Sequence, residues 1–326
     1  MGVAFLLAPC VTANAQSAAP GRITSRSTIK VPAWLYPSPA PSSAVPLDSL
    51  TPRRLTSSRV VYTDLETHDR FSIPDWYPAS HAPTPHVVSH DRNPALFACG
   101  YCHLPDGVGR PENAMLAGLP YNYIVQQLAD MKARHRQGAW SQPFGPNTSM
   151  LAVADSATDQ EVRAAARYFS RATPRRRAEV RETTTIRHPK AALGLYARDP
   201  SGGEEALGNR IIEMVDDLER HDLRDAHVGY VAYVPTGSIS RGRELATSGR
   251  RTGGQTCASC HGPRLRGVAL VPPIAGRSPG YILRQLLSFH EGTRTAATGA
   301  PMREVVAALT LDEMIALAAY VSARSP

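Results

Sequence analysis

Residues 257–261 read CASCH, and residues 99–103 read CGYCH, the same pattern 158 residues earlier. The spacing CxxCH is typical of covalent haem attachment. Each thiol can add across one vinyl group of haem, and the adjacent imidazole then ligates the iron from one side. The sequence therefore predicts two covalently bound haem c groups. Their anchors are Cys99, Cys102, Cys257 and Cys260, and their proximal iron ligands are His103 and His261.

Two other chemistries also use paired cysteines. Four thiolates from two CxxC pairs would complete a tetrahedral zinc site, and a single CxxC pair is also typical of redox dithiols. Neither alternative explains why a histidine follows both pairs in a chain with 11 histidines among 326 residues. Haem attachment is the interpretation that accounts for every fixed position of the motif.

The two motifs begin an internal repeat, which predicts two similar structural units. At the constant offset of 158, Leu116-Ala117-Gly118 corresponds to Ile274-Ala275-Gly276. After a loop that differs in length, the offset becomes 152. The equivalent pairs used below are Tyr123 and Tyr281, Gln127 and Gln285, Arg136 and Arg294, and Met150 and Met302.

Met150 and Met302 are the predicted distal iron ligands. A thioether is a soft ligand that raises the haem potential, and a His/Met pair fills both axial positions. Methionine is more often a packing residue, so the repeat is used to choose among the candidates. Met115, Met131 and Met314 have no methionine at the equivalent position, and Met214 lies outside both repeats; these four are assigned to packing.

The residues that follow CASCH resemble a class I cytochrome c domain. They read IAGRSPGYILRQL, GAPM and LTLDEMIALAAYVSA, in that order. The pair of units resembles the tandem dihaem cytochromes c of the bacterial periplasm, over about residues 95–172 and 238–324. The resemblance implies an all-α fold of two small domains. Each would enclose one haem with an exposed edge and pass single electrons.

Residues around the two haems have predicted supporting roles. Buried propionates need hydrogen-bonding partners, for which Tyr123, Tyr281, Arg136 and Arg294 are candidates. Packing at the helix surface and in the core is the equally weighted alternative for these four residues. The backbone carbonyls of Ala114 and Pro272 are expected to accept a hydrogen bond from Nδ1 of His103 and His261, which would orient each ring.

Five segments are expected along the chain: a secretory signal at 1–20, a proline-rich arm at 21–94, cytochrome c domains at 95–172 and 238–326, and an inter-domain insert at 173–237. The signal combines the apolar core Val3–Ala8 with the small-residue cleavage site Ala13-Asn14-Ala15. No Lys or Arg precedes that core, so a truncated or misassigned start is the alternative.

The arm and the insert are expected to be ordered. Proline fixes extended or turning backbone, and a disordered linker would be poor in aromatic residues. The arm contains Trp34, Tyr36, Phe71, Trp76 and Tyr77, and its His81, His86 and His90 are expected at the surface rather than on a metal or haem. In the insert, 207–218 has helical spacing and 230–234 reads as extended; this segment would pack between the domains, orient them or provide a docking surface.

Helical periodicity predicts helices over 121–135, 159–170 and 239–248. Asp155 or Ser156 is the expected cap of the second of these. Gly242 and Leu245 are expected where the third helix crosses the last helix near Tyr320. Prolines interrupt the segment before Cys99, so the first domain lacks a helix equivalent to 239–248.

The net charge of +8 and the pI near 9.4 favour an acidic redox partner. No nucleic-acid-binding signature accompanies the arginines, so nucleic acid is not an expected partner. No run of 18 apolar residues occurs, so no transmembrane helix is expected, although peripheral association with a membrane complex is compatible with the sequence.

The resemblance implies a periplasmic carrier of single electrons rather than an enzyme. The expected donor is a dehydrogenase or a quinol-cytochrome c reductase, and the expected acceptor is an oxidase or another cytochrome. One alternative is a haem enzyme, such as a peroxidase or a sulfur-compound oxidoreductase, which would need an open iron position. The other is an electron-wiring subunit of a membrane complex.

Overall fold

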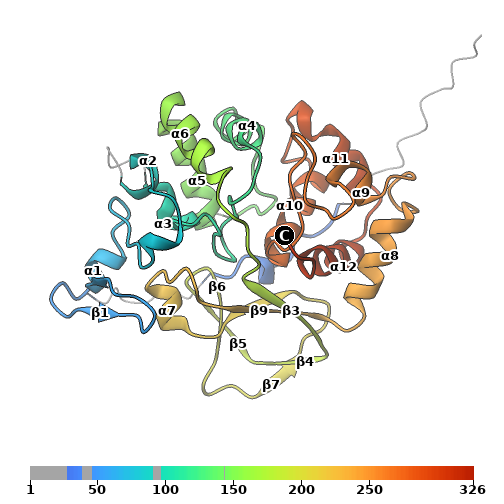
Figure 1. The fold of residues 1–326 in the computed structure, drawn as a ribbon. Coiled ribbons are helices and arrows are strands. Elements are labelled where there is room, and N and C mark those ends of the chain that lie inside the picture. The colour runs from blue at the N-terminus through green and yellow to red at the C-terminus, as the bar shows by residue number, and fades with distance from the viewer. Residues whose placement is uncertain (1–27, 39–45, 91–96, 143) are drawn as a thin grey trace, which may run out of the picture.

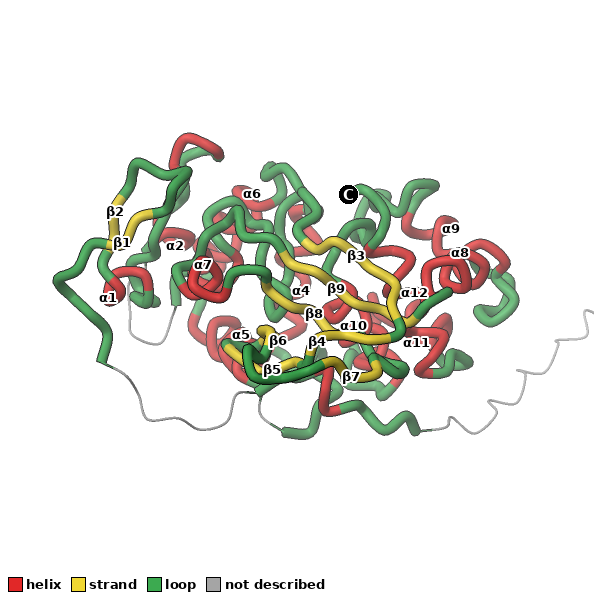
Figure 2. The backbone as a smooth tube through the Cα atoms, turned by 90° about the horizontal axis from the view of Figure 1, so that it is seen from below, coloured by secondary structure: helices red, strands yellow, loops and turns green. Residues whose placement is uncertain are grey.

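The computed structural model describes residues 28–38, 46–90, 97–142 and 144–326, so the predicted secretory signal lies outside the described residues. Two helical units lie next to each other, and a β-sheet lies beneath both of them (Figure 1). Seen from below, the strands extend across helices of both units (Figure 2). The expected all-α fold is therefore wrong for the insert, although it describes the two units that contain the CxxCH motifs.

The first helical unit, unit 1, consists of α3 (Cys99–His103), α4 (Tyr121–Lys132), α5 (Gly145–Ser156) and α6 (Asp159–Phe169). The predicted helices at 121 and 159 are confirmed, and α4 ends three residues before the expected end. The expected cap of α6 is wrong. Thr158 caps this helix in a capping box with Glu161, which satisfies two backbone N–H groups reciprocally.

The second helical unit, unit 2, consists of α8 (Ser238–Ser248), α9 (Cys257–His261), α10 (Pro279–His290), a 3-10 turn η3 (Ala297–Gly299), α11 (Ala300–Val306) and α12 (Leu311–Ser322). Gly242 lies against α12, where an added Cβ would be 2.7 Å from the Cβ of Tyr320 and would meet the Ala316 carbonyl. The predicted crossing of α8 and α12 at Gly242 is thus confirmed. Residues of α12 form much of the core of this unit.

Unit 1 has a short replacement for α8. Helix α2 (His86–Ser89) has only four residues, and Pro85 stands at its N-cap. Its Val87 and Val88 are buried in one cluster with Ala166 and Phe169 of α6. The absence of a long first helix from the described part of unit 1 agrees with the prolines of this segment, and two valines cover α6 instead.

The insert forms most of the sheet layer. A five-stranded sheet has the order β3-β9-β8-β6-β5, and β4 pairs separately with β7. The bounds are β3 (Ala178–Thr183), β4 (Thr185–Arg187), β5 (Pro189–Ala192), β6 (Leu195–Arg198), β7 (Glu204–Ala206), β8 (Ile212–Val215) and β9 (Tyr230–Pro235), and α7 (Leu218–Asp222) lies between the last two.

The extended segment predicted at 230–234 is confirmed as β9, whereas the helix predicted over 207–218 is wrong. Its centre is strand β8, and all four residues of that strand are buried. A strand buried on both faces shows no apolar-polar alternation. Its apolar run therefore has the same appearance in sequence as part of a buried helix.

The arm is ordered over its described residues, as predicted. It contains the 3-10 turns η1 (Ala33–Leu35) and η2 (Pro78–Ser80), the strand pair β1 (Arg53–Arg54) and β2 (Val61–Tyr62), and helices α1 (Asp64–Thr67) and α2. Leu35 and Tyr36 join the core of unit 2. Trp76 is buried farther along, and its indole N–H donates to the Leu223 carbonyl of the insert at 2.7 Å.

The three arm histidines have different surroundings. His86 and His90 are exposed, as expected. The imidazole of His81 is partly covered, because it lies between the carboxylate of Asp75 (3.2 Å) and the hydroxyl of Tyr168 (3.1 Å). His81 therefore links the arm to α6 through hydrogen bonds.

None of the described helices is long and apolar enough to cross a membrane alone. One bent pair, Ala297–Val306 with Leu311–Ser322, meets the criterion jointly by length and composition, with a bend of 112°. The expected segment boundaries along the chain remain a prediction.

Candidate haem-binding sites

An open pocket, whose empty space of about 680 Å³ includes the solvent at its mouth, lies among the helices of unit 1. Cys99, Cys102, His103 and Met150 all border it, so α3 and α5 bring the four predicted haem-binding residues of this unit to one space. The remaining wall is largely apolar and includes Leu116, Ile124, Leu128, Val153, Ala165 and Phe169. Two thiols, an imidazole and a thioether around an apolar cavity are the donor set and the surroundings that a haem c group requires.

The two proximal histidines are oriented in the same way. His103 Nδ1 lies 2.8 Å from the Ala114 carbonyl oxygen, and His261 Nδ1 lies 2.8 Å from that of Pro272, so both predicted contacts are confirmed. A carbonyl only accepts, so Nδ1 is the protonated nitrogen in each ring and Nε2 carries the free lone pair. Burial lowers the pKa of both imidazoles, which favours the neutral form that ligates iron.

Unit 2 carries the equivalent residues on α9 and α11. The side chains of Cys257 and Met302 both pack against the core of this unit. His261 is buried, whereas Cys260 is exposed. Thr256 caps α9 by accepting the backbone N–H of Ser259. The motif of unit 2 therefore lies closer to the surface than a fully enclosed site would require.

The four motif cysteines are free thiols in the structure, with no disulfide among them. Burial raises the pKa of Cys99 to about 12 and that of Cys257 to about 11. These thiols are therefore neutral at physiological pH, and thioether formation with haem would leave no titrating sulfur at either position.

The predicted propionate contacts lie where the two units meet. Arg136 and Arg294 are partners in an antiparallel backbone bridge, so equivalent residues of the repeat face each other. The Gln127 amide oxygen accepts from both guanidinium groups, at 2.9 and 2.5 Å. The Gln285 amide oxygen also accepts from both, at 3.3 and 3.1 Å. This arrangement has approximate two-fold symmetry and joins the units through side chains.

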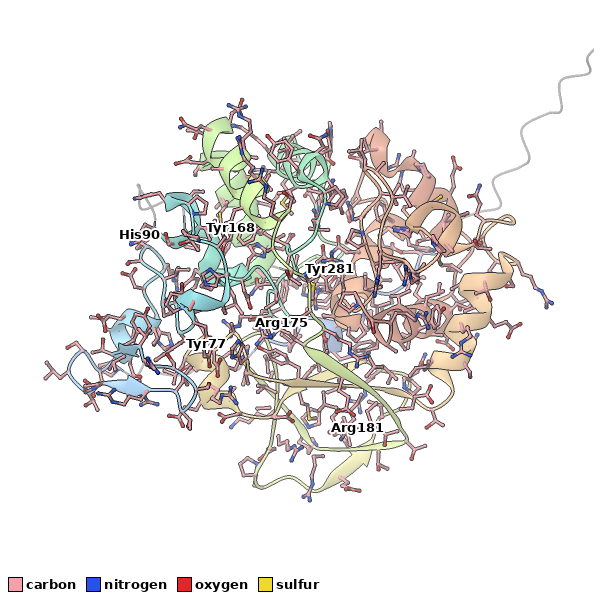
Figure 3. All side chains as sticks on the ribbon, viewed as in Figure 1. Tyr77, His90, Tyr168, Arg175, Arg181 and Tyr281 are labelled. Carbon is pink, nitrogen blue, oxygen red and sulfur yellow. The ribbon has the colours of Figure 1, made fainter. Side chains whose placement is uncertain are left out.

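Two tyrosines complete this cluster. The Tyr281 hydroxyl accepts from Arg136 Nη2 at 3.1 Å, and Figure 3 shows Tyr281 between the two units. Burial alone would raise the pKa of Tyr123, but the charges of Arg294 and Arg136 lower it overall. The structure therefore brings together all four residues that the sequence offers as candidates for propionate contacts.

Arg277 is a member of this cluster that the sequence analysis missed. It is buried, its Nη1 donates to the Met115 carbonyl of unit 1 at 2.5 Å, and its pKa is lowered by burial. Neither Arg277 nor Arg294 forms an ion pair with a carboxylate in the described part of the chain. Buried cations require compensating charge, and this excess of positive charge fits a site that receives haem propionates. Leu119 occupies the equivalent position in unit 1, so the repeat gave no signal for Arg277.

The comparisons with known proteins agree with this geometry. The Cytochrome c family model matches residues 239–325. A cytochrome c4 of Stutzerimonas stutzeri is 31% identical over 145 residues, which cover 40% of this chain and 69% of the relative. A cytochrome c4 of Azotobacter vinelandii is 26% identical over 227 residues, covering 68% of this chain and 82% of the relative.

A third relative is named as the thiosulfate dehydrogenase electron acceptor of Stutzerimonas stutzeri strain A1501. It is 28% identical over 231 residues, which cover 70% of this chain and 79% of the relative. These matches cover 69–82% of the length of each relative. The two CxxCH motifs fit covalent attachment of two haem groups. The chain belongs to the cytochrome c4 family of tandem dihaem class I cytochromes c, which transfer electrons.

Proposed function

We propose that this protein is a periplasmic electron carrier with two closed haem sites. It takes single electrons from a dehydrogenase or a quinol-cytochrome c reductase and delivers them to an oxidase or another cytochrome. The single observation that carries this proposal is the cavity of unit 1. An imidazole from α3 and a thioether from α5 border the same space, which supports a pair of axial ligands for an iron bound there.

We assign His103 and Met150 as the axial ligands in unit 1, and His261 and Met302 in unit 2. When bound, each haem supplies an iron that alternates between ferric and ferrous states. The protein itself fixes the orientation of the ligand side chains. The Ala114 and Pro272 carbonyls hold the imidazoles, and the capping boxes at Thr158 and Thr310 fix the start of the helix that closes each unit.

The cluster of Arg136, Arg294, Tyr123 and Tyr281 is assigned to the haem propionates. The cations of this cluster lie on both sides of the contact between units, so a charge change at one haem acts on the side chains of the other unit. A sulfur-compound dehydrogenase is the donor class that the name of the third relative supports.

The test is a spectroscopic comparison of oxidised holoprotein with Met150→Ala and Met302→Ala, by optical absorption and low-temperature EPR. We expect two low-spin haems in the unmutated protein. Each variant should lose the thioether-to-iron absorption of one haem, because alanine offers no ligand. Met131→Ala removes a buried methionine of α4 outside the proposed sites and should keep both low-spin signals.

A high-spin haem in the unmutated protein would contradict the closed-site proposal and favour a haem enzyme with an open iron. A ligand variant with unchanged spectra would contradict the assignment at that methionine. Purification of the holoprotein alone, rather than attached to a membrane complex, separates the carrier from a wiring subunit.

A further inference from the structure

The two CxxCH motifs differ in how far the rest of the chain covers them. In unit 1, Gly100 is buried against the arm, and a Cβ added there would lie 2.8 Å from the Val88 carbonyl and would meet Ile73. The guanidinium of Arg224 lies 3.4 Å from the ring centre of Tyr101, which stands between the two cysteines. Arg224 also donates to the Tyr101 carbonyl at 2.9 Å. The arm and the insert thus both lie directly on the first motif.

The loop after the first motif is covered by the same segments. Leu104 and Val108 are only 1% and 4% exposed, and they pack with Ala226 of the insert and Tyr77 of the arm. Arg175 pairs with Asp106 of this loop and donates to the Ala226 carbonyl at 2.8 Å. Figure 3 shows Tyr77 and Arg175 on the side of unit 1 that faces the insert.

The equivalent loop of unit 2 is open. Arg264, Arg266 and Ala269 are exposed, and Val268 and Leu270 are 53% and 60% exposed. Val268 lies close to the motif, because a Cβ added to Gly262, the residue after His261, would be 3.0 Å from Val268 Cγ2. Exposed apolar side chains that adjoin a site are typical of the centre of a protein interface.

Charge in this region has a single sign. Residues 245–290 contain no Asp or Glu, and arginines 250, 251, 264 and 266 flank the second motif. Arg251 pairs with Glu313, whereas Arg264 and Arg266 form no ion pair with any described residue. A basic rim around an apolar centre attracts an acidic protein surface and raises its rate of encounter.

Covalent chemistry links this surface to electron exchange. In the holoprotein the cysteine sulfurs would be bonded to haem, so the surface beside Cys260 would adjoin the cofactor. Cys260 is exposed, while Cys102 is partly covered and Tyr101 beside it lies under Arg224. An approaching protein can therefore reach Cys260 of unit 2 directly, whereas the arm and the insert lie on the motif of unit 1 at Gly100 and Tyr101.

We propose that the surface formed by Cys260 and the loop 263–270 is the electron-exchange port of this protein. It docks an acidic redox protein beside the second CxxCH motif. This inference rests on the proposed electron-carrier function and adds a docking site to it.

The test measures reduction of the oxidised holoprotein by reduced plant-type [2Fe–2S] ferredoxin, an acidic one-electron donor, in a stopped-flow instrument. One electron leaves the ferredoxin cluster, which becomes oxidised, and one ferric haem becomes ferrous. The double variant Arg264→Glu/Arg266→Glu should lower the second-order rate constant at low ionic strength at least about tenfold. It should also flatten or reverse the dependence of this rate on salt concentration.

The control variant is Arg167→Glu/Arg171→Glu, which makes the same charge change at two exposed arginines at the end of α6 in unit 1. Its rate constant should stay within about twofold of the unmutated value when the encounter occurs at unit 2. A second variant, Leu270→Ser, removes apolar area from the tip of the loop without changing its charge. It should lower the rate constant several-fold at every salt concentration.

Three outcomes overturn the inference. An equal fall in the unit 1 control would show that net charge alone sets the rate. Normal reduction of Arg264→Glu/Arg266→Glu would leave the carrier function intact and remove the port. Loss of binding to anionic phospholipid vesicles with unchanged ferredoxin rates would assign the surface to a membrane. Reduction of the unmutated holoprotein by dithionite but not by ferredoxin would also contradict docking of an acidic protein, whereas a high-spin haem in its spectra is the result that would contradict the carrier function.

Discussion

Glu213 is a buried carboxyl where the sheet, the arm and α10 meet. Its Oε2 accepts from the Ser278 hydroxyl at 2.9 Å, and its Oε1 has no hydrogen-bond partner among the described residues. Burial, which outweighs the opposing effect of Arg284, raises the pKa of Glu213 to about 7. This carboxyl is therefore protonated over a pH range in which an exposed glutamate is charged.

We predict that ionisation of Glu213 lowers the free energy of unfolding as the pH rises. A carboxyl whose pKa is raised by folding favours the folded state fully below the unfolded pKa, and this contribution is lost as the pH rises through about 7. The loss is roughly 3 kcal/mol. Glu213→Gln should match the unmutated protein at pH 4 and be more stable than it at pH 8, as measured by urea unfolding.

The control for this prediction is Glu204→Gln, which removes an exposed carboxylate of the same insert. It should leave the pH dependence of the free energy of unfolding unchanged. Equal unfolding free energies for Glu213→Gln and the unmutated protein at pH 8 would contradict the buried-carboxyl interpretation.

At the scale of single residues, the repeat was an effective guide where both units use the same residue. It identified the cysteines and histidines and the methionine that borders the cavity of unit 1. It failed for Arg277, which acts through a contact with the other unit, and for Glu213, which lies in the insert outside both repeats. Arg277 reaches Met115, and Glu213 reaches Ser278, and neither contact has an equivalent in the other half of the chain.

At the scale of elements, the crossing of α8 and α12 depends on the absence of a side chain at Gly242. We predict that Gly242→Ala destabilises the protein by about 1–3 kcal/mol, because overpacking pushes the two helices apart. The matched control is Gly145→Ala at the start of α5, where an added Cβ meets no atom within 4 Å.

Gly145→Ala should be neutral or more stable by up to about 1 kcal/mol, since alanine is the better helix former. Thermal and urea unfolding of the three holoproteins provide the comparison. A Gly242→Ala protein as stable as the Gly145→Ala protein would mean that the crossing is not closely packed.

Helices were easier to predict than strands in this chain. The amphipathic pattern of α4 and α6 and the position of α8 follow from local sequence, so their bounds were close. The strands of the insert are short, and β8 is buried on both faces, so its sequence carries no period of two. Residues of β8 form a strand because they pair with β9 and β6. Pairing between distant parts of the chain cannot be predicted from the sequence of one segment alone.

At the scale of the whole molecule, Arg224 connects three parts of the chain. Its Nε donates to the Thr67 carbonyl of the arm at 3.0 Å, and its Nη1 donates to the Tyr101 carbonyl of unit 1. Burial lowers the pKa of this guanidinium to about 10, which leaves it charged at neutral pH. The insert is thereby fixed to both the arm and the first CxxCH motif.

We predict that Arg224→Ala loosens this contact without altering either haem site. The free energy of unfolding should fall by about 1–3 kcal/mol. Hydrogen exchange should accelerate at 64–90 and 218–226, while the absorption spectrum stays the same. Arg187→Ala, at an exposed residue of β4, should show neither effect. Unchanged exchange in the arm would contradict the connecting role of Arg224.

The difference between the two units could not be predicted from the repeat. Both units follow the same sequence pattern, and the cover over unit 1 comes from segments outside it, at Ile73, Tyr77, Arg224 and Ala226. Contacts between residues more than a hundred positions apart in the sequence are set by packing of the complete chain. The sequence predicted two equivalent sites, and the arm and the insert make them unequal.

The parallel pairing of β3 with β9 has a consequence for how the chain could be shortened. Thr183, at the end of β3, is paired with Pro235, at the end of β9. Neighbouring strands lie about 4.8 Å apart, and consecutive Cα atoms are about 3.8 Å apart. Removing residues 184–234 would therefore leave a gap that one peptide bond nearly closes. Residues 184–234 therefore leave and rejoin the chain at almost the same point, and a shortened chain could run from β3 directly into α8.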